Sequence, residues 1–170
     1  PQKVINRSFC IFSLCVAAWA FSLSLFQLSG DFRWARLTYF FASFIPATFI
    51  GFVKVFPGEE EPLKINLIFP YLLALIFGVL SYTNLVIRGV VSLEWGTTLE
   101  LGPYYFLFAI YFWGIMMSSF VSLVVKYKKS SKASKMQIMY VFAGTLISAL
   151  VGMTVAIFLP LLGFSRLYSL

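Results

Sequence analysis

Five long runs of apolar residues, separated by short polar segments, dominate the chain. They cover residues 9–28, 37–53, 65–87, 104–125 and 138–159, and none contains Asp, Glu, Lys, Arg or His. A helix needs roughly 20 apolar residues, and at least about 17, to cross a hydrocarbon core about 30 Å thick. Four runs reach the typical length, and Trp34 and Ala35 extend the second one past Arg36. Because the runs lack the alternation of barrel strands, we expect helices.

This pattern predicts an all-α fold, a polytopic transmembrane helical bundle with five spans. The 170 residues are 61% hydrophobic and 11% charged, whereas an average soluble domain carries about 25% charged residues. Since the spans use most of the length, we expect a single transmembrane domain over residues 1–170. The chain begins with Pro1 and ends just after a Pro-interrupted apolar stretch, so we expect it to be part of a longer protein.

Positive charge is distributed unevenly between the two sides of the predicted bundle. The side that holds the N-terminus carries nine Lys and Arg residues, against four on the other side. By the positive-inside rule, Pro1 is predicted in the cytoplasm and Leu170 on the outer face. The net charge of +7 is thereby explained by topology, and no nucleic-acid partner is expected. We expect the basic loop between the last two spans to contact lipid head groups through Lys126, Lys128, Lys129, Lys132 and Lys135.

The chain lacks the residues that most catalytic and metal sites require. It contains no His, and all six acidic residues fall in the predicted loops. Ion-coupled transport usually needs ionisable groups within the membrane, haem usually needs His, and a serine hydrolase needs a base. Cys10 and Cys15 alone cannot hold zinc. We therefore expect no catalytic residue, no metal site and no cofactor.

Two features of the runs bear on how the helices move and pack. Pro46 lies in the middle of the second run, where it is expected to kink the helix and act as a hinge. Small residues recur at every fourth position in the last two runs, as Gly114, Ser118 and Ser122 and as Gly144, Ser148 and Gly152. Because such repeats let helix backbones approach closely, we expect these stripes to pack within the bundle, with each other as one option.

Aromatic and polar residues gather on the predicted outer side, and two interpretations stay open. One is an interfacial belt of aromatic residues with polar loops. The other is a ligand pocket with aromatic walls and few polar anchors. For Arg33 and Arg36 on this side, snorkelling to head groups and pairing with Glu94 or Glu100 are the alternatives. In the pocket hypothesis, the ligand-binding residues are Arg36, Tyr39, Asn84, Trp95, Glu100 and Tyr104.

Short motifs in a fixed order carry a family resemblance. They are Phe32-Arg33-Trp34-Ala35-Arg36-Leu37, then Ile45-Pro46, Phe52-Val53-Lys54-Val55-Phe56-Pro57, Thr83-Asn84, Gly102-Pro103-Tyr104-Tyr105 and Lys126-Tyr127-Lys128-Lys129. With these, over roughly residues 6–160, the chain resembles the N-terminal seven-helix membrane region of bacterial sensor histidine kinases. In that family a His often precedes the aromatic-Pro end of the second helix, where Gly51 stands here.

The resemblance implies a function and a place in a larger receptor. The five runs would be helices two to six of seven, in the bacterial inner membrane. The chain would be the sensory input module of a signalling receptor of the histidine-kinase type, working as a homodimer or in a larger membrane complex. It would bind a small or lipid-like ligand, and any kinase activity would lie outside this chain. A small accessory or scaffold subunit of a larger membrane complex stays open as an alternative.

Overall fold

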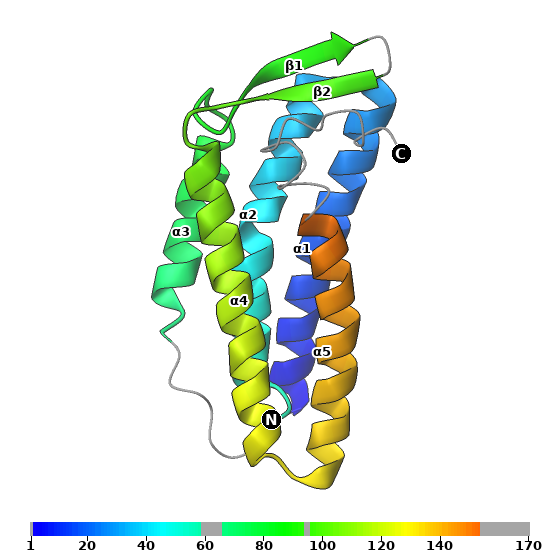
Figure 1. The fold of residues 1–170 in the computed structure, drawn as a ribbon, viewed down its shortest axis with the longest axis vertical. Coiled ribbons are helices and arrows are strands. Elements are labelled where there is room, and N and C mark those ends of the chain that lie inside the picture. Colours follow the sequence, from blue (N-terminus) through cyan, green and yellow to red (C-terminus); the bar gives the residue numbers. More distant parts are fainter. Residues whose placement is uncertain (1, 59–65, 94–95, 154–170) are drawn as a thin grey trace.

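The computed structural model of the chain describes residues 2–58, 66–93 and 96–153. Within these ranges it contains five helices and one two-stranded sheet, which form an elongated bundle with a β-hairpin across one end (Figure 1). The elements in chain order are α1 (Gln2–Ser29), α2 (Phe32–Val55), α3 (Ile68–Leu80), β1 (Ile87–Leu93), β2 (Gly96–Leu101), α4 (Tyr105–Lys129) and α5 (Lys132–Met153). The predicted helical bundle is confirmed.

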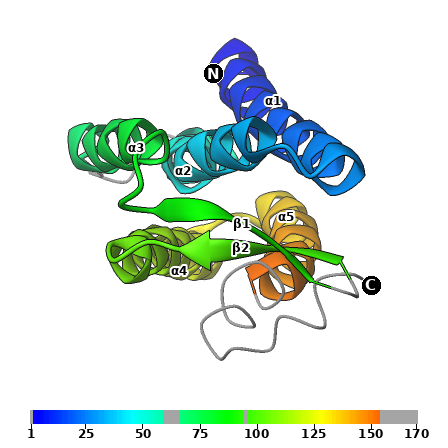
Figure 2. The same cartoon turned by 90° about the horizontal axis from the view of Figure 1, so that it is seen from above.

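The helix α2 lies at the centre of the bundle. Seen from above, α1, α2 and α3 form one layer with α2 in the middle, and α4 and α5 form a second layer (Figure 2). The helix α2 packs against α1, α3 and α4, whereas α5 packs mainly against α4. Most residues of α2 from Ala42 onwards are buried as a result. A movement of α2 would therefore affect its contacts with three other helices.

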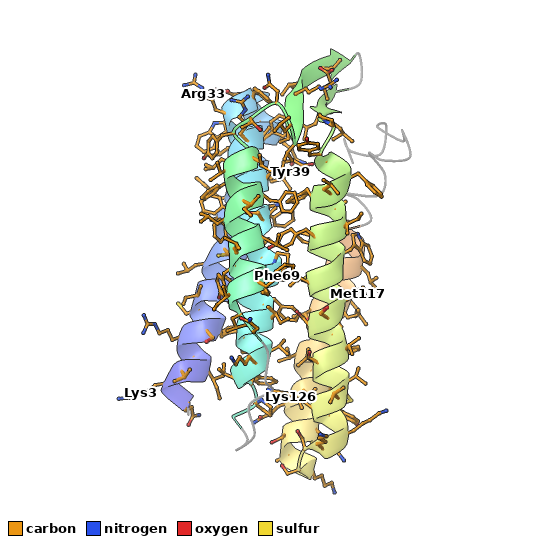
Figure 3. The ribbon with its side chains drawn as sticks, turned by 90° about the vertical axis from the view of Figure 1, so that its left-hand side faces the viewer. Lys3, Arg33, Tyr39, Phe69, Met117 and Lys126 are labelled. Atoms are coloured by element: carbon orange, nitrogen blue, oxygen red, sulfur yellow. The ribbon has the colours of Figure 1, made fainter. Side chains whose placement is uncertain are left out.

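The bundle has two distinct ends, the hairpin end and the basic end. The hairpin end carries β1 and β2, and Arg33 lies near it (Figure 3). The basic end carries the start of α1 and the connection from α4 to α5, and Lys3 and Lys126 lie there (Figure 3). The two described acidic residues, Asp31 and Glu100, both belong to elements at the hairpin end.

Three of the described helices, α1, α2 and α4, are long and apolar enough to cross a membrane. The helix α3 has 13 residues, which corresponds to about 20 Å and is shorter than a hydrocarbon core. The predicted fifth span extends past Met153, so residues 154–159 lie outside the described residues. The helices α1, α2 and α4 lie over the first, second and fourth predicted spans. Each of them also extends beyond the apolar run into flanking polar residues.

The prediction of one span over residues 65–87 is wrong at its C-terminal end. The helix ends at Leu80, and the hydroxyls of Ser81 and Thr83 donate back to the carbonyls of Gly78 at 2.7 Å and Leu80 at 2.6 Å. Hydroxyl side chains that bond to nearby carbonyls offer the backbone an alternative to the helix. Val86 and Ile87, which follow, are buried in the core, and Ile87 begins β1 instead of extending the helix. Hydropathy does not distinguish these two fates.

Most of the segment between the third and fourth apolar runs forms the β-hairpin, in which β1 pairs antiparallel with β2. The hairpin is joined to the entry of α4 by backbone hydrogen bonds, from Gly102 N to Val86 O at 2.9 Å and from Tyr104 N to Leu85 O at 2.8 Å. A Cβ atom at Gly102 would lie 2.2 Å from the Leu85 carbonyl oxygen. This position therefore requires glycine because two backbone segments touch there.

The expectation that the small-residue stripes pack within the bundle is wrong at the positions that can be tested. A Cβ atom at Gly114 or at Gly144 would meet nothing within 4 Å. The hydroxyls of Ser118 and Ser148 donate to the carbonyls of these two glycines, one turn earlier in the same helices, at 2.8 and 2.9 Å. Gly114, Ser118, Gly144 and Ser148 are exposed, and α4 and α5 pack through larger side chains, including Phe120 and its ring contact with Phe142.

Candidate functional site

The start of α2 sets the geometry of the hairpin end. Gly30 has a positive φ of 64°, which allows the chain to turn after α1. Asp31 then caps α2, since its carboxylate accepts a hydrogen bond from Arg33 N at 2.8 Å. The same carboxylate lies 3.3 Å from Arg33 Nε. The Asp31 carboxylate thus both caps α2 and pairs with Arg33.

Arg36 follows on the next part of the helix and is turned toward the loop after α3. Its guanidinium lies over the Phe32 ring, with 4.4 Å between the Cζ atom and the ring centroid. Its Nη2 atom donates to Asn84 Oδ1 at 2.9 Å. This bond joins two residues 48 positions apart and holds the guanidinium in one orientation. The structure thereby brings together two of the predicted site residues, Arg36 and Asn84.

The hydrogen-bonding capacity of Arg36 is incompletely used. Its Nε atom is buried and has no hydrogen-bond partner in the described part of the chain. A buried donor without an acceptor costs about 1–3 kcal/mol. Among the residues described, Glu100 makes no ion pair with this guanidinium, and Glu94 lies outside the described residues. The site therefore combines a positively charged, oriented side chain with a donor that lacks an acceptor.

The other predicted ligand-binding residues do not converge on Arg36. Tyr39 is only 7% exposed, and its ring packs 5.9 Å from that of Tyr105 and 5.5 Å from that of Phe108, which makes it a core residue beneath the hairpin end. Tyr104 is 45% exposed. Glu100 is exposed on β2, opposite Gly89 on β1. Trp95 lies outside the described residues.

Pro46 is buried inside α2, close to polar contacts that join three helices. The Ser43 hydroxyl donates to the Ala74 carbonyl of α3 at 2.9 Å. The Tyr111 hydroxyl of α4 donates to the Ser43 carbonyl at 2.6 Å. These contacts were missed in the sequence because Ser43 and Tyr111 stand within apolar runs and nothing in their spacing relates one to the other.

Tyr71 of α3 lies close against Gly51 of α2 and limits the size of the side chain at that position. A Cβ atom at position 51 would be 3.0 Å from the Tyr71 hydroxyl oxygen. A larger side chain there displaces the Tyr71 ring or separates α2 from α3. The Tyr71 side chain thus occupies the space that a larger residue at position 51 would need.

At the basic end, Lys126 holds the C-terminal end of α2. Its Nζ atom donates to the carbonyls of Val53 at 2.7 Å, Lys54 at 2.9 Å and Phe56. The last carbonyls of a helix lack partners within the helix and carry partial negative charge, so an ammonium group stabilises them. Lys126 therefore binds the protein's own backbone, and head-group contact remains a prediction for the other four lysines of this loop.

Comparison with known proteins places the chain in a family. A family model described as the N-terminal 7TM region of histidine kinase matches residues 2–166. No curated protein and no solved structure matches the chain. Together with the helices of membrane-spanning length, the match identifies an integral membrane protein of signal transduction, and it confirms the resemblance seen in the motifs. The chain belongs to the family of N-terminal 7TM sensor regions of histidine kinases.

Proposed function

We propose that this sensor region binds a small or lipid-like ligand at the hairpin end and passes the resulting bias to a kinase domain outside this chain. The observation that carries the proposal is the contact between Arg36 and Asn84. It fixes a guanidinium at the end of the bundle and leaves the buried Nε atom without an acceptor. Glu100, Tyr104 and Trp95 stay predicted ligand-binding residues of this chain, and Tyr39 packs in the core beneath the hairpin end.

The proposed orientation puts the hairpin end on the outer face of the bacterial inner membrane. The support is the distribution of basic residues among the described elements. Three of them, Arg33, Arg36 and Arg88, belong to elements at the hairpin end. Eight belong to elements at the basic end: Lys3, Arg7, Lys54, Lys126, Lys128, Lys129, Lys132 and Lys135. The positive-inside rule assigns the richer end to the cytoplasm.

The proposed signal passes along α2. A ligand shifts a conformational equilibrium only if it binds the two states with different affinity. Arg36 lies near the start of α2, and α2 contacts three other helices and is held by Lys126 at its other end. Pro46 lacks the N–H that would complete the helical hydrogen bonding between these points, so we propose it as the hinge. In this account the chain acts within a homodimer or a larger membrane complex.

The remaining lysines of the basic loop are proposed to fix the cytoplasmic face of the bundle. Lys128, Lys129 and Lys132 are exposed, and the Lys135 ammonium lies 5.8 Å from the Tyr127 ring centroid. Each basic residue near an anionic membrane surface contributes about 1 kcal/mol to the attraction between the protein and that surface. Such anchoring keeps the basic end fixed while the hairpin end responds to a ligand.

The test is the kinase output of the full receptor with Asn84→Leu, measured as autophosphorylation in membrane vesicles. We expect a changed output at unchanged expression, because the substitution removes the acceptor that orients Arg36. Gln27→Leu is the matched control, since Gln27 is an exposed amide near the end of α1. Trp95→Ala is a second variant, at another predicted ligand-binding residue. If neither Asn84→Leu nor Trp95→Ala changes the output, the ligand site proposed at this end is wrong.

A further inference from the structure

Among the residues described, Arg36 and Asn84 keep hydrogen-bond donors that no acceptor uses. Its Nε is buried without an acceptor, and its only hydrogen bond within the described residues runs from Nη2 to Asn84 Oδ1. Because the Asn84 oxygen is used as the acceptor, its amide nitrogen is left as a further donor. Guanidinium and amide donors match the oxygen atoms of a carboxylate or phosphate, and Asn84 is exposed beside the partly buried Arg36.

The protein supplies no such anion to Arg36 among the residues described. Asp31 caps α2 and lies against Arg33, whose side chain is 91% exposed. Glu100 stands on β2 opposite Gly89 and forms no ion pair with Arg36. Among the residues that the structure describes, no carboxylate therefore pairs with the partly buried Arg36 guanidinium. Held by Phe32 and Asn84, it is already in place for a ligand, which lowers the entropy lost on binding.

An aromatic track leads away from Arg36 along the contact between α2 and α3. Phe40 and Phe44 follow Arg36 at intervals of four residues, so they lie on the same side of α2. The Phe40 ring lies 5.3 Å from the Phe44 ring and 5.8 Å from the Tyr82 ring. Tyr82 is 49% exposed. An apolar chain laid on these rings would leave the polar end of the same molecule at Arg36.

From this arrangement we propose that the ligand is an amphiphile with an anionic head group. Its carboxylate or phosphate binds Arg36 and the Asn84 amide, and its apolar chain lies on Phe40 and Tyr82. The inference rests on the proposed function and names the chemical class of the ligand at that site. A membrane lipid and a diffusible amphiphile share this chemistry, and the experiment distinguishes them.

The experiment is a binding titration of the full chain in nanodiscs of zwitterionic phosphatidylcholine, with radiolabelled dodecyl phosphate and with empty nanodiscs subtracted. We expect saturable binding that Arg36→Met weakens by at least about tenfold, since a hydrogen bond to a charged group has this magnitude. We expect Arg36→Lys, which keeps the charge and loses the planar fork, to weaken binding less than Arg36→Met does. Dodecanol, which lacks the anion, and inorganic phosphate, which lacks the chain, should each bind more weakly.

Arg33→Met is the matched control for charge. It removes the same charge three residues away, from a side chain that is almost fully exposed. A loss of about twofold or less is expected there, because an exposed charge acts only through the screened field of the surface. Equal losses with Arg33→Met and Arg36→Met would mean a diffuse surface effect and would overturn the proposal. Thermal unfolding of each variant shows whether it is folded. If Arg36→Met does not fold, Arg36→Lys replaces it in the comparison with Arg33→Met.

One comparison distinguishes a membrane lipid from a diffusible amphiphile as the ligand. A second comparison distinguishes failure of this inference from failure of the proposed function. In nanodiscs that contain phosphatidylglycerol, suppressed titration identifies a resident lipid, and unchanged titration identifies a diffusible amphiphile; both support the anionic class. Absence of dodecyl phosphate binding overturns this inference, yet a changed output with Asn84→Leu would still support a ligand of another class. Binding that depends on Arg36 without any change in output with Asn84→Leu and Trp95→Ala would support the site and refute its sensory use.

Discussion

The two ends of the bundle use their basic side chains in opposite ways. At the basic end, Lys126 donates to three carbonyls of the last turn of α2 and the residue that follows it. At the hairpin end, the described residues offer Arg36 a single acceptor, Asn84, and leave its buried Nε atom without one. The hairpin end is instead held by backbone contacts around Gly102.

This difference separates structural charge from available charge. A cation whose donors are satisfied by the protein stabilises the fold and has little left for a ligand. A cation that is oriented but incompletely satisfied, in a region held together by other contacts, can exchange partners without unfolding. The comparison therefore predicts that stability depends on Lys126 and on Gly102, while ligand response depends on Arg36 and Asn84.

The largest effect on stability is expected from Gly102→Ala. The added Cβ would lie 2.2 Å from the Leu85 carbonyl oxygen, so the backbone of the hairpin end must move. Overpacking against a rigid neighbour costs up to about 3 kcal/mol, which thermal unfolding followed by circular dichroism in detergent would detect. Gly114→Ala is the control, because nothing lies within 4 Å of its Cβ. There, Ala should leave the helix unchanged or stabilise it by up to about 1 kcal/mol. Similar losses at both positions would contradict the backbone account of the hairpin end.

A somewhat smaller loss, about 2 kcal/mol, is expected from Lys126→Met. The substitution removes the ammonium that satisfies the Val53, Lys54 and Phe56 carbonyls and keeps an apolar side chain of similar length. The same unfolding measurement applies. Lys128→Met removes an exposed charge two residues later and should stay within about 0.5 kcal/mol of the wild type. Equal effects of the two substitutions would show that Lys126 has no special role at this end.

Between the two ends, Gly51→Ala is expected to cost about 1 kcal/mol, because the Tyr71 hydroxyl lies 3.0 Å from the added Cβ and must shift. Tyr71→Phe removes the atom in conflict, so the double variant should recover most of the loss. The measurement is a double-mutant cycle of unfolding free energies. Additive losses in the cycle would mean that the two residues do not restrain each other.

The smallest effect on stability is expected from Asn84→Leu, at about 0.5 kcal/mol, since Asn84 is exposed and contributes one hydrogen bond. The same variant is expected to change the receptor's output, so the two readouts should diverge. The unfolding temperature is measured on the sample used for the kinase assay. A large loss of stability would place Asn84 with the structural contacts and would remove the contrast between the two ends.

Much of the helical architecture could be predicted from hydropathy. The start of α2 was anticipated from Trp34 and Ala35, which extend the apolar run past Arg36, and α2 begins at Phe32. The end of α3 was not anticipated, because Val86 and Ile87 are as apolar as residues of a membrane helix, although Val86 lies in the buried segment before β1 and Ile87 begins β1. An apolar residue is buried in either structure, so hydropathy alone does not distinguish them.

The candidate site was predicted only in part. Arg36 and Asn84 were both named from the sequence, and the structure joins them. Tyr39 was named for its aromatic side chain, which the fold uses in the core. The role of Lys126 was missed, because a lysine in a basic loop has the same sequence signature whether it meets a lipid or a carbonyl. Gly114 shows the converse, a motif typical of helix packing that faces open space.

The sequence by itself determined the membrane-spanning helical bundle, the accumulation of positive charge toward one end, and the family. These properties follow from composition and short motifs along the chain, because crossing a hydrocarbon core requires only apolar length and internally bonded backbone. The tertiary structure alone decided which charges are satisfied. Arg36 meets Asn84 48 positions away, and Lys126 meets Val53 73 positions away. The reason is physical: a hydrogen bond requires donor and acceptor within about 3 Å, and only the packing of α2 against its neighbours sets that distance.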